Sequence, residues 1–248
     1  MKDPLCLLAL DTSSPQGGLA LVQQKTAAEA CCLLAERSWN ESSSHSDIIT
    51  QEVELLLKSA GLSVKDLTAV ALGLGPGSFT GIRVGVNFAR SLGYSLDLPI
   101  IGLNSLEILA FNGLEFLKAQ TEIRHILCLT NAFRNKLYAA IYGIDMKNGT
   151  HPLLEILPPQ AVSPRDLPAL LPESRYLCLG NGFEAYQESF PADLPLKILR
   201  RPEISDSPQA SALAQWALAY GKSRPWTDIK PLYIRASEPE EKLKTTVS

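Results

Sequence analysis

The stretch Gly73-Leu-Gly-Pro-Gly-Ser-Phe-Thr-Gly-Ile-Arg83 joins an apolar segment, residues 67–72, to a segment of helical character, residues 78–96. A short, uninterrupted apolar run of this kind predicts a buried strand. Glycines and a proline between a strand and a helix indicate a backbone held in unusual dihedral angles. Ser78 and Thr80 can cap the helix, and the N–H groups of its first turn are a potential anion site. A strand, a tight loop and a helix in succession predict an α/β fold.

The two familiar phosphate loops do not match this stretch. A Walker loop requires a lysine after its glycines, and none is present. A dinucleotide-binding loop requires glycine where Ser78 stands, and it belongs at the first strand with an acid about 20 residues further on. The loop therefore needs another explanation.

Small residues recur along the predicted helix at every fourth position: Gly81, Gly85, Ala89 and Gly93. Each glycine inside a helix costs about 1 kcal/mol relative to alanine, so a stripe of them indicates close approach of another backbone. Two explanations stay open at this point. The helix lies flat on its own sheet, or the stripe contacts another helix of this chain or of a partner.

Composition limits the class of protein. The 248 residues suffice for two modest domains, and the net charge of −3 comes without a Lys/Arg cluster, which argues against strong direct nucleic-acid binding. No signal peptide or membrane-spanning run is present, so we expect a soluble cytoplasmic protein. The odd number of cysteines and the absence of Cys-x-x-Cys predict buried free thiols at Cys6, Cys31, Cys32, Cys128 and Cys178.

Hydrophobic periodicity predicts a repeated order of elements. Strands at 5–10, 18–22 and 28–35 precede a helix at 46–60, a strand at 67–72, a helix at 78–96 and a strand at 99–103. After a helix at 105–118, strands at 125–129, 137–144 and 153–157 precede a short helix at 163–171, a strand at 176–179 and a helix at 211–220. This order predicts a duplicated architecture. Residues 236–248 are charged and aperiodic, which predicts a disordered tail.

Several segments together resemble one family. Leu8-Ala-Leu-Asp-Thr-Ser-Ser14, the loop from Gly73 to Val84 and Pro99-Ile-Ile-Gly-Leu-Asn-Ser105 resemble the TsaB (YeaZ) family. Tyr138-Ala-Ala-Ile-Tyr142 and Pro231-Leu-Tyr-Ile-Arg235 match as well, and the matches follow in order over nearly the whole chain. The glycine-rich motif is long and specific, whereas the others alone are weak.

The resemblance implies a two-lobed α/β fold of the actin, sugar-kinase and Hsp70 type, with mixed sheets flanked by helices. It places an N-lobe at 1–103, which carries the partner-binding helices, and a C-lobe at 104–207, with a C-terminal helix at 208–235 packing back on the N-lobe. It also implies a non-catalytic scaffold, a paralogue of the transferase TsaD. This scaffold is required for N6-threonylcarbamoylation of the adenosine next to the anticodon, in tRNAs that read codons beginning with A.

The implied partners are TsaD and, in the assembled complex, the ATPase TsaE, with tRNA contacted only indirectly and no membrane involved. No cofactor is implied, and whether a nucleotide sits at the interface with TsaD stays open. In the family, N-lobes pair through their first two helices, as a homodimer or with TsaD, which favours an intermolecular role for the small-residue stripe. The expected interface residues are Ile49, Val53, Leu56, Gly81, Arg83, Gly85, Ala89, Arg90 and Gly93. For Arg83 and Arg90, an ordinary solvated face is the alternative.

The resemblance also locates the loops that hold phosphate in nucleotide-binding members of this fold. Asp11, Thr12 and Ser13 occupy the first loop, as a vestigial phosphate site or, alternatively, as a plain turn in which Asp11 accepts backbone hydrogen bonds. The second loop, 130–135, usually reads Asp-Ala-Arg in the family but has Asn131 and Phe133 here. Because asparagine cannot act as a base, catalysis at this loop is not expected.

Metal and hydrolase chemistry find little support. TsaD carries a His-x-x-x-His pair, but His45, His125 and His151 form no such pair, and no histidine is close in sequence to Ser13, Ser14 or Ser78. The rival function is an ATP-dependent phosphotransferase or hydrolase of the same fold, which needs a second acid at the cleft. A third, an independent tRNA binder, conflicts with the absence of a basic cluster in the sequence.

Overall fold

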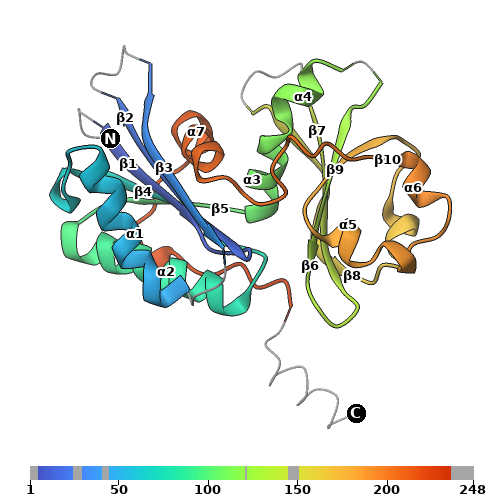
Figure 1. Ribbon diagram of the computed structural model, residues 1–248, viewed down its shortest axis with the longest axis horizontal. Helices are drawn as coiled ribbons and strands as arrows, with labels where there is room; N and C mark the ends of the chain where they lie inside the picture. The colour runs from blue at the N-terminus through green and yellow to red at the C-terminus, as the bar shows by residue number, and fades with distance from the viewer. Residues whose placement is uncertain (1–4, 25–29, 41–44, 121, 145–150, 236–248) are drawn as a thin grey trace, which may run out of the picture.

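The computed structural model describes residues 5–24, 30–40, 45–120, 122–144 and 151–235. Within these ranges the chain forms two five-stranded sheets that lie side by side, each flanked by helices (Figure 1). The expected disordered tail, 236–248, lies outside the described residues. No helix in the described part of the chain is both long and apolar enough to cross a membrane.

The first sheet has the strand order β3-β2-β1-β4-β5. Its antiparallel part comprises β1 (Leu5–Asp11), β2 (Gln16–Gln24) and β3 (Cys32–Asn40), and β4 (Ala69–Gly73) and β5 (Ile100–Leu103) continue it parallel to β1. Every residue of β1 is buried, because both faces of the sheet are covered. This explains why its sequence is almost uniformly apolar rather than alternating.

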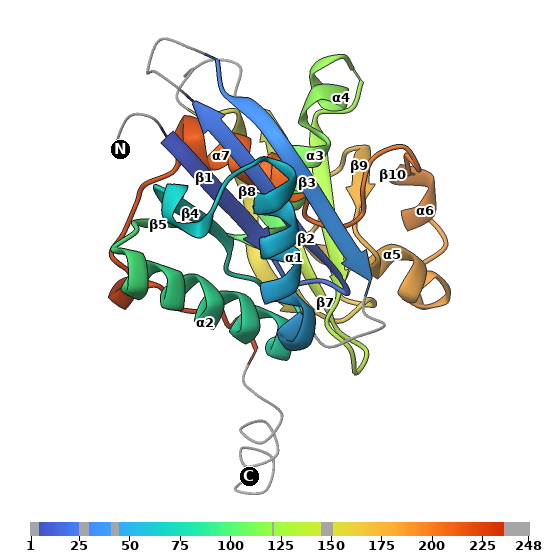
Figure 2. The same cartoon turned by 60° about the vertical axis from the view of Figure 1, so that its left-hand side comes forward.

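Helices from different parts of the sequence cover the two faces of this sheet. On one face, α1 (His45–Ser59) and α2 (Phe79–Leu96) pack on Cys6, Leu8 and Leu10 of β1 (Figure 2). On the other face, α7 (Ala210–Tyr220) packs on Leu5, Leu7 and Ala9. A single 3-10 turn, η1 (Val64–Asp66), precedes β4. The first lobe is thus a three-layer unit that includes a helix from the end of the chain.

The second sheet repeats the first in strand order and direction. It comprises β6 (His125–Asn131), β7 (Leu137–Ile144), β8 (Leu153–Val162), β9 (Tyr176–Leu179) and β10 (Ile198–Leu199), in the order β8-β7-β6-β9-β10. As in the first sheet, the three hairpin strands are antiparallel and the last two run parallel to the first. The duplication predicted from element order is therefore visible in the topology, and the expected two-lobed α/β fold is confirmed.

Short helices flank the second sheet. One face carries α3 (Ser105–Asn112) and α4 (Leu114–Lys118). The other carries η2 (Leu167–Leu170), α5 (Gly182–Ala185), η3 (Gln187–Ser189) and α6 (Leu194–Lys197). After α7 the chain continues through η4 (Trp226–Asp228) and runs along α2 toward the first turn of that helix (Figure 2).

Some sequence-based expectations were wrong in detail. The helix expected at 105–118 is interrupted at Gly113, where an added Cβ would lie 2.8 Å from Leu177 Cδ2 on the second sheet. The helix expected at 163–171 is only a short 3-10 turn. The third strand extends to Asn40, because it is an edge strand whose outer residues tolerate polar side chains. Cys31 and Cys32 are exposed rather than buried, whereas the other three cysteines are buried.

Candidate functional site

The glycine-rich loop packs on the turn between β1 and β2. The Ser78 backbone N–H donates to Ser13 O at 2.7 Å, and Thr12 Oγ1 donates to Gly81 O at 2.7 Å. Ser78 caps the helix as expected, because its Oγ accepts from the Gly81 N–H. Two of the N–H groups that were expected to bind an anion are therefore occupied by acceptors of the chain itself.

The small-residue stripe of α2 faces the protein's own first lobe. An added Cβ would lie 2.0 Å from Thr12 O at Gly81, 2.4 Å from Thr12 Oγ1 at Gly85 and 2.8 Å from Trp226 Cβ at Gly93. Ala89 has no exposed surface. The close approach that the glycines permit is made within the chain, so the expectation that this stripe packs on a partner helix was wrong.

The expected interface residues of α1 are also internal. Ile49, Val53 and Leu56 belong to the core between α1, α2 and the sheet, with exposed fractions of 4 % or less. Sequence periodicity identified the buried face of α1 correctly; of these three residues, Val53 also lines the groove between α1 and α2 described below, whereas Ile49 and Leu56 are not among its lining residues. Of the nine expected interface residues, Arg83 and Arg90 alone retain substantial exposure.

Asp11 is a fully buried carboxylate that ties three segments together. Its Oδ1 accepts from the Ser13 N–H at 2.8 Å and from Ser13 Oγ at 2.7 Å, and its Oδ2 accepts from Ser105 Oγ at 2.8 Å. Ser105 Oγ in turn accepts from the Gly75 N–H at 3.0 Å. Burial raises the pKa of Asp11, and these hydrogen bonds oppose the rise. Gly73 is required here because a Cβ would lie 1.7 Å from Asp11 Oδ2.

The second lobe contains a counterpart of this turn. Asn131 Oδ1 accepts from the Phe133 N–H at 2.8 Å, as Asp11 Oδ1 does from Ser13, so the same local turn recurs at the end of β6. The hydroxyl of Tyr186 donates to the same oxygen at 3.0 Å. Phe133, Arg134 and Asn135 have positive φ angles of 57°, 52° and 56°, so the turn is tightly wound. The loop of the second lobe thus has the same local turn as the loop of the first lobe, but an uncharged asparagine stands in place of the aspartate.

These two loops face each other across a small cavity of about 110 Å³ between the lobes. Sequence analysis missed one acid of its wall, Asp206. Its Oδ1 accepts from the Gly180 N–H at 2.7 Å, and its Oδ2 forms a salt bridge with Arg200. No local pattern identifies Asp206, because its partners lie at the end of β9 and after β10. The cavity is lined by Ser13, Ser14, Pro15, Pro76, Gly77, Ser78, Thr130, Asn131, Phe133, Asn181, Asp206, Ser207 and Pro208.

The histidines have structural partners. His45 begins α1 and accepts at Nδ1 from Trp39 Nε1 at 2.9 Å, and its Nε2 lies 3.2 Å from Ser14 O. His125 Nδ1 lies 2.8 Å from Ser174 Oγ, and His151 Nε2 lies 3.1 Å from Glu107 Oε1. Within the described ranges, no three His, Cys, Asp or Glu residues come together as a metal site would need.

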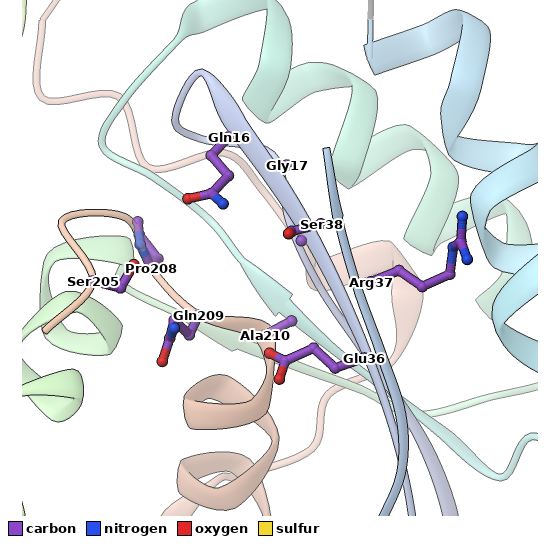
Figure 3. Close-up of a pocket in the computed structure, with 10 residues that line it drawn as sticks. Gln16, Gly17, Glu36, Arg37, Ser38, Ser205, Pro208, Gln209 and Ala210 are labelled. Carbon is purple, nitrogen blue, oxygen red and sulfur yellow. The ribbon is translucent and has the colours of Figure 1, made fainter. Parts of the chain in front are cut away.

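A larger, polar cavity of about 270 Å³ lies between the strands β2 and β3 and the segment that leads into α7 (Figure 3). Its carboxylate, Glu36, accepts from the Ser211 N–H at 3.1 Å and from Ser211 Oγ at 2.7 Å. Arg37 points away from the cavity in Figure 3 and pairs with Glu52 of α1. Because both charged side chains hold helices on the sheet, this cavity offers no unused charged group to a ligand.

A largely apolar groove lies between α1 and α2, with a volume of about 480 Å³. Phe88 and Leu92 of α2 form one wall, opposite Val53 and Leu57 of α1. The remaining wall and rim residues are Thr50, Glu54, Lys58, Gly61, Leu62, Ser63 and Val64. An apolar groove with a polar rim has the composition of a protein-binding surface.

Comparison with known proteins identifies the family. The family model for TsaD, tRNA N6-adenosine threonylcarbamoyltransferase, matches residues 34–187. The TsaB protein of Bacillus subtilis, named for tRNA threonylcarbamoyladenosine biosynthesis, is 31 % identical over 96 % of this chain and 97 % of its own. The TsaB protein of Haemophilus influenzae is 27 % identical over 93 % of this chain and 94 % of its own.

Solved structures agree on the fold. YeaZ from Pseudomonas aeruginosa is 22 % identical, covers 92 % of this chain and 99 % of its own, and superposes with a TM-score of 0.72. A second structure from that organism, described as similar to the peptidase YeaZ, also has a TM-score of 0.72. Together with the full-length similarity to curated relatives, this shows that the chain belongs to the TsaB (YeaZ) family of tRNA threonylcarbamoyladenosine biosynthesis proteins.

Proposed function

We propose that the protein is a non-catalytic subunit in threonylcarbamoyladenosine formation on tRNA, and that it binds a TsaD-like transferase through the α1–α2 groove. In the assembled complex it supports engagement of a TsaE-like ATPase. The observation that carries the proposal is the groove itself, since it places an apolar surface between the two helices that pair in this family.

The proposed occupant is the corresponding helix pair of the transferase. The TsaD family model matches residues 34–187, which include α1 and α2, so a TsaD-like subunit has equivalents of both helices. Two such pairs can meet face to face in a four-helix arrangement around an approximate two-fold axis. A homodimer through the same groove is the competing assembly.

The chemistry of the interlobe cavity supports a non-catalytic role. Both carboxylate oxygens of Asp11 already accept hydrogen bonds, from Ser13 and Ser105. Asn131 carries no charge, and Asp206 forms a salt bridge with Arg200. A phosphotransferase or hydrolase of this fold needs an acid that can reach a metal or water. None of these three side chains offers one in this arrangement.

Introducing a charge into the apolar wall of the groove tests the proposal. We expect Phe88→Glu to abolish co-elution with the TsaD-like protein of the same organism in size-exclusion chromatography, because a carboxylate would be buried in an apolar contact. Leu154→Glu is the matched control, since Leu154 is an apolar residue of β8 with 54 % exposure, away from the groove. A melting curve of each lone variant reports folding. Unchanged co-elution of Phe88→Glu contradicts the proposal.

The competing homodimer is distinguished by the mass of the lone protein. If the groove mediates self-association, the wild-type mass in light scattering should fall on dilution, and Phe88→Glu should remain a monomer at all concentrations. A dimer that survives in Phe88→Glu, together with lost transferase binding, assigns the groove to the transferase alone.

A further inference from the structure

One flank of α2 carries a surface that the proposed function does not use. The C-terminal strap, residues 221–235, runs along α2 on the side away from the α1–α2 groove (Figure 2). The Leu232 N–H donates to Leu74 O at 2.8 Å near one end of the strap, and Arg224 pairs with Ile100 near the other. We call the outer side of α2 together with the strap the strap face.

Aromatic rings and arginines alternate on the strap face. Phe79 and Tyr233 stack with centroids 5.0 Å apart, and the Arg83 guanidinium lies 3.8 Å from the Phe79 centroid. Arg83 Nε also donates to the Tyr233 hydroxyl at 2.8 Å. At the other end of the helix, Tyr94 and Trp226 meet edge to face at 5.3 Å, with Arg90 5.7 Å from the Trp226 ring.

These rings are held in place yet accessible. Tyr94 has 72 % of its surface exposed and Tyr233 has 43 %. Tyr94 follows Phe79 by 15 positions of the helix, so the two clusters lie about 22 Å apart at the usual helical rise. Exposed aromatic rings fixed by arginines are suited to stacking on flat ligand groups.

Positive charge accumulates on the same face. Helix α2 contains no acidic residue, and its Arg83 and Arg90 lie over the strap's Tyr233 and Trp226 rings. The strap itself adds three exposed cations, Lys222, Arg224 and Lys230. Two acidic residues lie in these segments: Asp97 caps the C-terminal end of α2, and Asp228 belongs to the strap. None of these five cations forms an ion pair with another residue in the described ranges. The protein as a whole carries a net charge of −3, so the positive charge of the strap face contrasts with the acidic balance of the rest of the chain.

We propose that the strap face binds a single-stranded segment of RNA, with its cations on phosphates and Tyr94 and Tyr233 stacked on bases. Unpaired cations provide the charge complementarity to a polyanion, and the exposed rings provide the stacking that single-strand binding uses. The choice of RNA over DNA rests on the proposed function in tRNA modification. The sequence shows no basic cluster, because these cations come from α2 and from a segment more than 130 residues later.

Fluorescence anisotropy with the full chain and a labelled single-stranded RNA of about 12 nucleotides tests the proposal. We expect Arg224→Glu/Lys230→Glu to weaken binding at least about tenfold at low salt. It should also lower the salt slope by about 1.4, or about 0.7 for each lost phosphate contact. Arg124→Glu/Arg165→Glu makes the same change in net charge on exposed positions of the second lobe, and it should change binding less than about twofold.

A separate substitution, at Tyr94, tests whether RNA bases stack on the exposed rings. Tyr94→Ala should weaken single-strand binding about fivefold or more, Tyr94→Phe should restore it, and a duplex RNA of equal length should bind more weakly than the single strand. Equal loss in both charge-reversal variants, or equal binding of duplex and single strand with no effect of Tyr94→Ala, overturns the proposal.

The same variants separate this proposal from the proposed function. Strap-face variants should still co-elute with the TsaD-like protein, whereas Phe88→Glu should lose the transferase and retain RNA. If the strap-face variants lose the transferase and bind RNA as the wild type does, the face is a protein interface and the RNA proposal is wrong.

Discussion

Gly85 lies where the second helix crosses the first hairpin, and no side chain fits there. An added Cβ would lie 2.4 Å from Thr12 Oγ1 and 3.3 Å from Leu10 Cδ1. Thr12 cannot simply turn aside, because its hydroxyl donates to Gly81 O. We therefore expect Gly85→Leu to destabilise the lone protein by about 1–3 kcal/mol or more through overpacking.

Thermal or urea unfolding of the lone protein measures this effect. Asn87→Leu is the matched control, since Asn87 is exposed on the same helix and its replacement should leave the midpoint nearly unchanged. An unshifted melt for Gly85→Leu would mean that the stripe is not packed within the chain.

Asp11 should make stability depend on pH. Burial raises its pKa, so the folded protein holds this proton more tightly than the unfolded chain does. From the ordinary aspartate pKa of about 3.9 up to the raised value, the folded state binds more protons, and its contribution to stability falls as pH rises. We expect this slope to be absent in Asp11→Asn. Urea unfolding across that range measures it, and a wild-type-to-variant difference independent of pH contradicts the prediction.

Among the elements, the strap is the part that periodicity could not predict. Residues 221–235 have no helical or strand pattern, yet Ile229 is 2 % exposed and joins the core under α2. Trp226 covers Gly93, which explains a glycine near the end of that helix. The helices α1 and α2 were predictable, because their apolar residues recur at helical spacing. Spacing shows which residues share a face, but it does not show which segment covers that face.

The strap should therefore contribute to the stability of the first lobe. We expect Ile229→Ala to lower the free energy of unfolding by about 2–5 kcal/mol, the usual cost of truncating a buried isoleucine. Thr227→Ala, two residues away and exposed, should have little effect. A melt of Ile229→Ala that matches that of Thr227→Ala would show that the strap is not docked in solution.

At the scale of the whole molecule, the duplication was predictable and the sites were not. The order of strands and helices repeats along the sequence, and both sheets then adopt the same topology. The interlobe cavity joins Asp206 to loops from residues 13–15, 76–78 and 130–133, so its composition depends on the packing of the lobes. The same is true of the strap face. Local pattern carries no information on contacts made across such distances in sequence.

The two lobes together predict a protein without ATPase activity of its own. The interlobe cavity of about 110 Å³ is well below the roughly 300 Å³ of ordinary small-molecule sites. The acid among its lining residues, Asp206, is paired with Arg200, and Asp11 behind the first loop is fully buried. We expect phosphate release from ATP and Mg²⁺ to stay far below about 1 s⁻¹ for the isolated protein.

Asn131→Asp makes this prediction sharper. The variant restores an acid at the second loop but leaves both Asp11 oxygens bonded to Ser13 and Ser105, so it should remain inactive. If the variant gains turnover near 1 s⁻¹, one substitution suffices to make an enzyme, and the cavity is a nearly intact active site. Turnover at that rate by the wild type contradicts the non-catalytic role outright. Absence of turnover in both proteins is the expected result, because Asp11, Gly73 and Ser105 hold the first loop closed.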